Sequence, residues 1–234
     1  MREGRRHDQL RPVEILVDYL EQPLGSVLYS QGKTKVLCTA SLDEGVPRWL
    51  RDSGRGWLTA EYSLLPASTG ERTQREAGAG KQKGRTVEIQ RLIGRAIRSV
   101  LDFEALGERT LWLDCDVLQA DGGTRCASIS GAYVAAARAL GRAGLSRVLP
   151  DSVAAVSLGI VESELLLDLD YEEDSSAEVD LNVVMTGSGR LVEVQATAER
   201  APFGREALSD LLDLAEGGIA EIGEAQKAAL DAAG

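Results

Sequence analysis

The chain has 234 residues, of which 44% are hydrophobic and 27% are charged, and its net charge at pH 7 is −11. This length fits one domain or two tightly joined halves with an ample core, and the chain has no apolar run of about eighteen residues that could span a membrane. The single histidine, His7, excludes a His-rich zinc site and argues against a Ser-His-Asp triad elsewhere in the chain.

The pattern of apolar residues predicts nine strands and four helices. The short segments 162–163 and 187–189 predict hairpin turns between consecutive strands. The order of strands, helix, strand, helix, strands and helices predicts an α+β fold with mixed sheets covered by helices. We expect strands at 13–19, 25–30, 35–41, 57–64, 110–118, 153–161, 164–169, 177–185 and 191–198. We expect helices at 86–101, 128–141, 205–216 and 218–229.

The three cysteines, Cys38, Cys115 and Cys126, form no CxxC pair, and two of them lie in strongly apolar strand patterns. We therefore expect buried free thiols, which are typical of a reducing compartment. The N-terminal residues 1–6 have no apolar stretch behind them of the kind that a secretion signal requires. Together these features predict a cytoplasmic protein.

A Gly-Gly turn stands between a predicted strand and a small-residue helix, in the run Asp121-Gly122-Gly123-Thr124-Arg125. Paired glycines let the backbone turn with its N–H groups facing outward, and a helix start adds aligned donors and a positive dipole end. Arg125 adds a planar fork that matches phosphate, and Thr124 adds a hydroxyl donor. The run therefore predicts an oxyanion site, against the alternative of an ordinary glycine turn beside an exposed arginine.

Basic residues gather in the segment 72–98, which holds eight of them against two acidic residues. The stretch 71–85 is rich in Gly, Arg and Lys and poor in apolar residues, so it predicts a mobile basic loop that suits a polyphosphate backbone. The remainder predicts an amphipathic helix whose arginines lie mainly on the faces away from the core. The basic residues are Arg72, Arg75, Lys81, Lys83, Arg85, Arg91, Arg95 and Arg98.

Acidic residues gather in the segment 151–234, which holds 19 of them against four basic residues. Seven lie within residues 168–180, and like charges packed this closely repel unless water or a cation separates them. Carboxylates from a loop and an adjacent strand suit Mg²⁺ that also keeps water and a substrate phosphate in its shell. We therefore single out Asp174 and Asp180 as metal ligands and expect a solvated acidic hairpin for most of the others.

Three long motifs are GWLTAEY at 56–62, GRTVEIQRLIGR at 84–95 and LDCDVLQADGGTR at 113–125. Shorter ones are QLRPV at 9–13, TKVLCTA at 34–40, EDS at 173–175, VDLNVVM at 179–185, EVQ at 193–195 and PF at 202–203. These motifs are spread over nearly the whole chain and follow one another as they do in the bacterial ribonuclease PH family. The chain closely resembles that family.

The resemblance implies a ribonuclease PH fold, similar to the second domain of ribosomal protein S5, in a single domain of residues 1–234. It also implies a phosphate-dependent 3′ exoribonuclease that trims the 3′ end of tRNA precursors, and also rRNA, and releases nucleoside diphosphates. In reverse the reaction is that of a tRNA nucleotidyltransferase. The family assembles as homohexameric rings, each a trimer of dimers.

The resemblance also implies roles for individual residues. The phosphate co-substrate would bind at Arg85, Gly123, Thr124 and Arg125. The catalytic carboxylates that hold Mg²⁺ or Mn²⁺ would be Asp174 and Asp180. RNA would be contacted by Arg72, Arg75 and Lys81.

The chain departs from the family at Ala67, where an arginine is common, and at Gly70-Glu71, in the loop that contacts RNA and packs in the ring. Two alternatives stay open: a catalytically inactive RNA-binding ring subunit, and a hydrolytic Mg²⁺ nuclease that uses water in place of phosphate. The presence of both carboxylates and both phosphate-site arginines argues against the first alternative. The anion site argues against the second.

Overall fold

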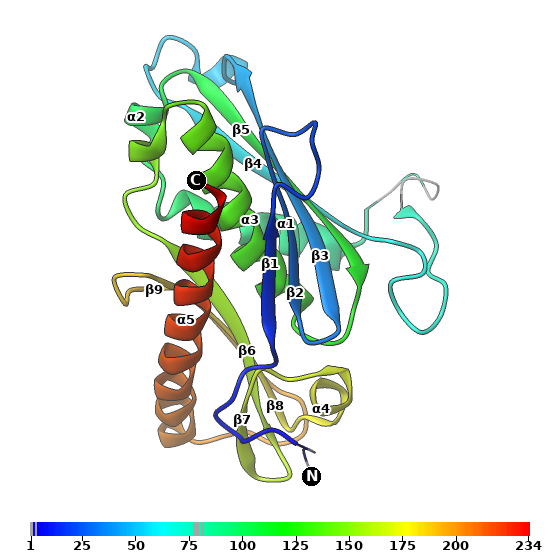
Figure 1. Ribbon diagram of the computed structural model, residues 1–234. Helices are drawn as coiled ribbons and strands as arrows, with labels where there is room; N and C mark the ends of the chain where they lie inside the picture. The colour runs from blue at the N-terminus through cyan, green and yellow to red at the C-terminus, as the bar shows by residue number, and fades with distance from the viewer. Residues whose placement is uncertain (1, 3, 77–79, 81) are drawn as a thin grey trace.

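The computed structural model describes residues 2, 4–76, 80 and 82–234, and it contains two β-sheets with helices packed against them (Figure 1). All nine predicted strands are present, so the α+β prediction is confirmed. The strands are β1 (Val13–Val17), β2 (Gly25–Gln31), β3 (Thr34–Glu44), β4 (Trp57–Leu64), β5 (Arg109–Gln119), β6 (Val153–Val161), β7 (Glu164–Leu167), β8 (Val179–Thr186) and β9 (Leu191–Ala198).

The first sheet has the order β1-β2-β3-β5-β4, and its neighbours are antiparallel except for the parallel pair β4 and β5. Parallel neighbours need a crossover, and helix α1 (Gly84–Arg98) lies between these two strands in the chain. Helix α3 (Thr124–Arg142) follows β5 after a turn of only four residues. The start of α3 therefore lies beside the C-terminal end of β5.

The second sheet has the order β7-β6-β8-β9 and is antiparallel throughout. Glu162 and Ser163, between β6 and β7, have φ of 50° and 66°, as the tight two-residue turns of hairpins require. Residues 187–190 join β8 to β9, with Gly189 at φ 79°. Both predicted hairpin turns are thus confirmed.

Helix α5 (Arg205–Ala233) is continuous, so the prediction of two helices at 205–216 and 218–229 is wrong. The prediction placed a break at the glycine pair 217–218, but Gly218 lies against the second sheet. A Cβ added to Gly218 would lie 2.9 Å from Leu167 Cδ1, so the missing side chain allows the helix to pack closely. The buried stripe of Leu211, Ala215 and Ile222 continues across the glycine pair and keeps the helix intact.

Two further differences concern the start of one helix and the presence of two short helices. Helix α3 begins at Thr124, four residues before the predicted start, because Gly123 serves as its N-cap. The short helices α2 (Phe103–Leu106) and α4 (Tyr171–Ser176) were not predicted. Each begins at an aspartate whose side chain accepts backbone N–H groups of the first turn, Asp102 for α2 and Asp170 for α4.

Helices α1 and α3 pack on the first sheet and α5 packs on the second, while α3 also contacts β6, so β6 is buried on both faces. The three cysteines are free and buried, as predicted, with Cys38 directly opposite Cys115 on β3 and β5. In the part of the chain that the structure describes, no helix has the length and apolar character needed to cross a bilayer.

Candidate active site between the two sheets

A cavity of about 1350 Å³ lies where the end of β5, the start of α3 and the second sheet meet. Its walls come from both sheets, because β4 and β5 contribute one side and β6, β8 and α4 the other. Residues 69–76, 80, 82, 83, 85 and 86 line it, and the described part of the basic loop protrudes at this side of the molecule (Figure 1). The predicted site residues that line this one cavity are Arg72, Arg75, Arg85, Gly123, Thr124, Arg125, Asp174 and Asp180.

The Gly-Gly turn has a left-handed backbone, with φ of 72° at Gly122 and 65° at Gly123. A Cβ added to Gly122 would lie 2.5 Å from the carbonyl oxygen of Leu169, so a larger residue cannot fit there. Gly123 is the N-cap of α3 and provides no side-chain cap, so the first N–H groups of the helix have no side-chain acceptor at that position. Such an end is suited to an anion.

The two predicted phosphate-site arginines belong to the first turns of two different helices, Arg85 in α1 and Arg125 in α3. Arg125 Nη1 donates to Gln195 Oε1 at 2.7 Å and to Glu88 Oε1 at 3.4 Å, which holds the guanidinium in place. Thr124 accepts a hydrogen bond from the Tyr62 hydroxyl at 3.0 Å, so its own hydroxyl hydrogen is free for another acceptor. Two cationic groups and one hydroxyl therefore face the same cavity as the helix end.

Asp174 lies on α4 and Asp180 on β8, so Asp174 belongs to a short helix and not to the loop that we expected. Burial and, to a smaller extent, the charge of the neighbouring Asp174 together raise the pKa of Asp180 to about 6, although Arg125 opposes this rise. Burial also raises the pKa of Asp174, although Arg85 and Arg125 oppose this. The two carboxylates are thus close enough to repel each other.

Two carboxylates are fewer than a complete protein-made metal site would use. Among the described residues, no group of three or more His, Cys, Asp or Glu side chains could hold a metal ion. The pair nonetheless fits a hard divalent cation that takes its remaining ligands from water and a substrate phosphate. A cation there would relieve the repulsion that raises the pKa of Asp180.

The expected solvated acidic hairpin is wrong for Asp168 and Glu173. Asp168 is only 1% exposed and is paired with Arg11, and Glu173 receives hydrogen bonds from Arg2 and Arg5. Sequence reasoning missed these N-terminal arginines, because their partners lie more than 150 positions away in the chain. The surplus of arginine in residues 2–11 was the only signal that could have indicated them.

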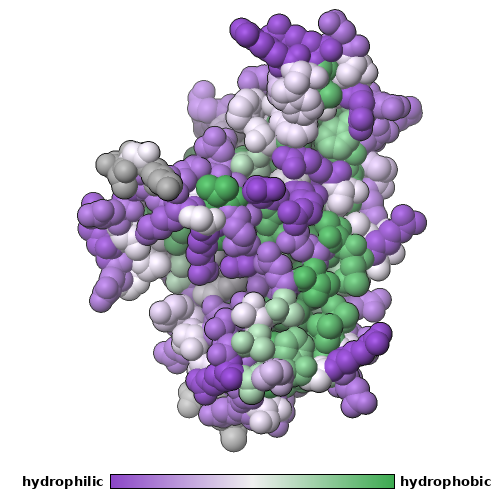
Figure 2. All heavy atoms as spheres, turned by 180° about the vertical axis from the view of Figure 1, so that it is seen from behind, coloured by the Kyte–Doolittle hydropathy of each residue, from purple (hydrophilic) through white to green (hydrophobic). Residues whose placement is uncertain are grey.

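Two of the three predicted RNA-contacting residues lie within the part of the chain that the structure describes. Arg72 and Arg75 line the cavity, whereas Lys81 lies outside the described residues. Glu76 ties the loop to the start of α1, since it accepts the Thr86 hydroxyl at 2.8 Å and the Lys83 N–H at 3.1 Å. In the view from behind, the left part of the molecule is largely hydrophilic, and a band of apolar residues runs through the lower right part (Figure 2).

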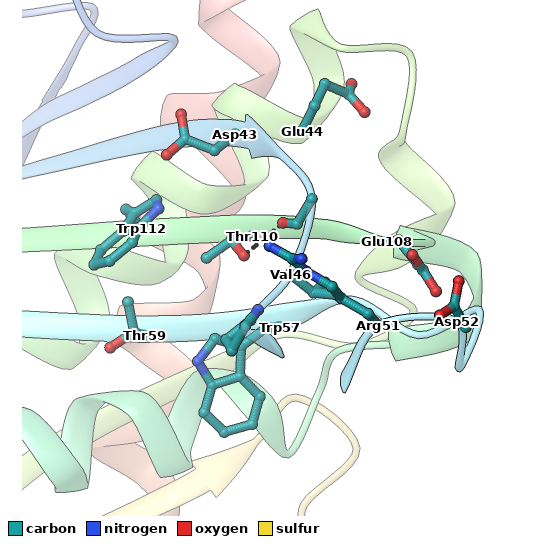
Figure 3. Close-up of a pocket in the computed structure, with 12 residues that line it drawn as sticks. Asp43, Glu44, Val46, Arg51, Asp52, Trp57, Thr59, Glu108, Thr110 and Trp112 are labelled. Carbon is teal, nitrogen blue, oxygen red and sulfur yellow. Dashed lines mark hydrogen bonds between the residues drawn. The ribbon is translucent and has the colours of Figure 1, made fainter. Parts of the chain in front are cut away.

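A second cavity of about 630 Å³ lies at the opposite ends of β4 and β5. Trp57, Thr59 and Trp112 form one side of it, and Arg51, Asp52 and Glu108 lie at the other (Figure 3). None of the predicted phosphate, metal or RNA residues that the structure describes contributes to this cavity. Among the described residues, those predicted to act on phosphate, metal or RNA therefore line only the larger cavity.

Two family models match the chain in order. The model described as 3′ exoribonuclease family, domain 1, matches residues 9–140, and the model described as domain 2 of the same family matches residues 151–218. A ribonuclease PH from Bacillus subtilis (strain 168) is 58% identical over 97% of this chain and 96% of its own. One from Corynebacterium glutamicum (strain R) is 57% identical over 97% of this chain and 95% of its own.

Solved structures agree on the fold. Rrp46 from rice (Oryza sativa) has a TM-score of 0.80 at 18% identity, covering 98% of this chain and 99% of that chain. A structure of the Archaeoglobus fulgidus exosome with RNA bound to the active site has a TM-score of 0.79 at 24% identity, covering 95% of this chain and 91% of that chain. Since both family models and full-length relatives above 50% identity match, the chain belongs to the ribonuclease PH family of 3′ exoribonucleases.

Proposed function

We propose that this protein is a phosphorolytic 3′ exoribonuclease that trims tRNA precursors at their 3′ ends and releases nucleoside diphosphates. The observation that carries the proposal is the single cavity that joins an anion seat at Gly123, Arg85 and Arg125 to the carboxylates Asp174 and Asp180. Phosphorolysis needs such a pairing, because an anionic nucleophile must approach an anionic phosphodiester.

Inorganic phosphate would bind at the start of α3. Arg85 and Arg125 neutralise its charge, while Thr124 and the free N–H groups after Gly123 orient it by hydrogen bonds. An oxygen of this phosphate attacks the phosphorus of the 3′-terminal phosphodiester. The bond to the 3′ oxygen of the preceding nucleotide breaks, that oxygen takes up a proton, and a nucleoside diphosphate leaves. No histidine base is needed, since phosphate already carries nucleophilic oxygens at neutral pH.

Asp174 and Asp180 would hold a divalent cation, Mg²⁺ or Mn²⁺, whose charge would stabilise the scissile phosphate and the departing oxygen. The support for this assignment is the donor set. Both side chains offer oxygen ligands, both line the cavity, and burial together with their mutual repulsion raises the pKa of Asp180 to about 6. Asn182 Nδ2, which donates to Asp180 Oδ1 at 3.4 Å, helps to orient that carboxylate.

The RNA would enter past the basic loop, with Arg72, Arg75 and Lys81 bound to its phosphates. We further propose that residues 1–234 act as a single catalytic domain, because the cavity takes walls from both sheets. A cytoplasmic homohexamer, a trimer of dimers, would be the active form. The support for packing between subunits is β9, an edge strand of the second sheet, which leaves Leu191 and Val194 exposed.

One assay separates the proposal from its alternatives. The protein is incubated with a 3′-extended tRNA and Mg²⁺, with and without inorganic phosphate, and the released nucleotides are identified. Phosphate-dependent nucleoside diphosphates support phosphorolysis. Nucleoside monophosphates without phosphate indicate a hydrolytic nuclease, and binding without cleavage indicates an inactive RNA-binding subunit.

A further inference from the structure

Arg11 is a buried arginine that joins the two sides of the candidate active site. It is 7% exposed and does not itself line the cavity. Its Nε and Nη2 donate to the two carboxylate oxygens of Asp168 at 3.0 and 2.7 Å, and its backbone N–H donates to Oδ2 at 2.7 Å. Burial alone would lower the pKa of Arg11, but the hydrogen bonds and charge of Asp168 outweigh it and raise the pKa.

On the phosphate side, Arg11 holds the Gly-Gly turn. Its Nη1 donates to the carbonyl oxygen of Asp121, the first residue of the turn. Thr34 supports the same turn, since its hydroxyl donates to the Gly122 carbonyl at 2.7 Å and accepts the Asp121 N–H at 2.9 Å. Arg11 and Thr34 bind these carbonyl oxygens. The N–H groups that follow at the start of α3 can therefore donate to a ligand in the cavity.

On the carboxylate side, Asp168 leads directly to α4. Asp168 has a left-handed backbone with φ 56°, and two residues later Asp170 caps α4 by accepting the Glu173 N–H at 3.0 Å. Helix α4 carries Asp174. Asp168 and its bonds to Arg11 therefore connect the helix that carries Asp174 to the turn proposed to bind phosphate.

We propose that Arg11 is a positioning residue that fixes the phosphate-binding turn against the α4 segment and so sets the spacing between bound phosphate and Asp174. The proposal rests on the function proposed above. A planar fork is required, because one guanidinium reaches both oxygens of Asp168 and the carbonyl of Asp121 at once. A shift of about 1 Å in such a seat can reduce catalysis by about a hundredfold.

The first test is Arg11→Lys, which keeps a positive charge beside Asp168 and most of the buried stem but cannot make all three bonds. We expect the KM for inorganic phosphate to rise about tenfold or more and kcat to fall as well, with little change in the KM for RNA. A purely structural loss would instead lower the fraction of active enzyme, so kcat would fall while both KM values stayed constant. This split separates a positioning role from general destabilisation.

The second test moves Arg11 without changing it. Gly32 has φ 58°, and a Cβ added there would lie 2.6 Å from Arg11 Cδ, so Gly32→Ala pushes the arginine stem. Gly54→Ala is the matched control, because Gly54 has φ 70° and no atom within 4 Å of the added Cβ. Both variants carry similar backbone strain, and we expect only Gly32→Ala to raise the KM for phosphate. If Gly32→Ala does not fold, judged by circular dichroism, Arg11→Lys decides.

Phosphate binding is also measured without turnover, as the rise in melting temperature with increasing inorganic phosphate. The Arg11→Lys protein should need about tenfold more phosphate for the same rise. If the wild-type enzyme shows no phosphate-dependent release of nucleoside diphosphates, the proposed function fails, and this binding measurement still tests the positioning role. A folded Arg11→Lys variant with wild-type phosphate protection and wild-type KM for phosphate overturns the inference.

Discussion

Replacing Asp180 with asparagine should stabilise the folded protein at neutral pH while it removes a carboxylate from the active site. Burial and the nearby Asp174 raise the pKa of Asp180 from 3.8 to about 6. The ionised form is therefore less stable in the folded protein than in the unfolded chain. Asparagine keeps the size of the side chain and an oxygen that can accept from Asn182, but it carries no charge to bury.

The magnitude follows from the size of the pKa shift. About two pKa units at 1.36 kcal/mol each give an upper bound of about 3 kcal/mol. Asp180 is only partly buried, so solvent screening reduces this value, and we expect a gain of about 1–2 kcal/mol. For a chain of this length that gain corresponds to a rise of about 2–8 °C in melting temperature.

The sign depends on pH. A folded-state pKa above the unfolded value makes wild-type stability fall as pH rises from about 4 through 6. The advantage of Asp180→Asn should therefore be full at pH 8 and nearly absent below pH 4. The assay is thermal unfolding at several pH values in chelator, without RNA, in parallel with phosphorolysis, which should be nearly abolished at every pH. A variant that is no more stable than wild type at pH 8 would refute the reasoning.

Three further predictions concern the phosphate seat and the loop. Arg85→Ala and Arg125→Ala should each lower kcat/KM for phosphate by a factor that corresponds to a loss of about 2 kcal/mol or more in transition-state stabilisation. RNA binding should change much less, and wild-type rates at limiting phosphate would contradict the assignment. Joint replacement of Arg72 and Arg75 by alanine should make the log–log salt dependence of RNA affinity shallower by about 1.4, or about 0.7 per lost contact, provided that light scattering shows an unchanged assembly. Gly122→Ala should abolish phosphate protection against unfolding, because its Cβ would meet the Leu169 carbonyl at 2.5 Å, and retained protection would show that the turn is not the seat.

Local sequence determined the strands and the glycine turn. The nine strands follow from short segments of alternating or continuous apolar residues, and the Gly-Gly turn follows from backbone conformations that other residues rarely adopt. The sequence predicted the ends of helices less accurately, because the ends depend on packing against other elements. The glycine pair 217–218 suggested a break, yet α5 continues, since the side-chain hydrogen of Gly218 faces Leu167.

The tertiary structure decided which of the charged residues act together. Residues 72–98 and 168–180 are each recognisable from charge alone, but only the folded chain brings Arg85, Arg125, Asp174 and Asp180 to one cavity. It also pairs two of the apparently solvated acids, the buried Asp168 and the half-buried Glu173, with N-terminal arginines. Such pairings join residues more than 150 positions apart, and no local pattern encodes them, because the free energy of a buried charge depends on what the fold places beside it.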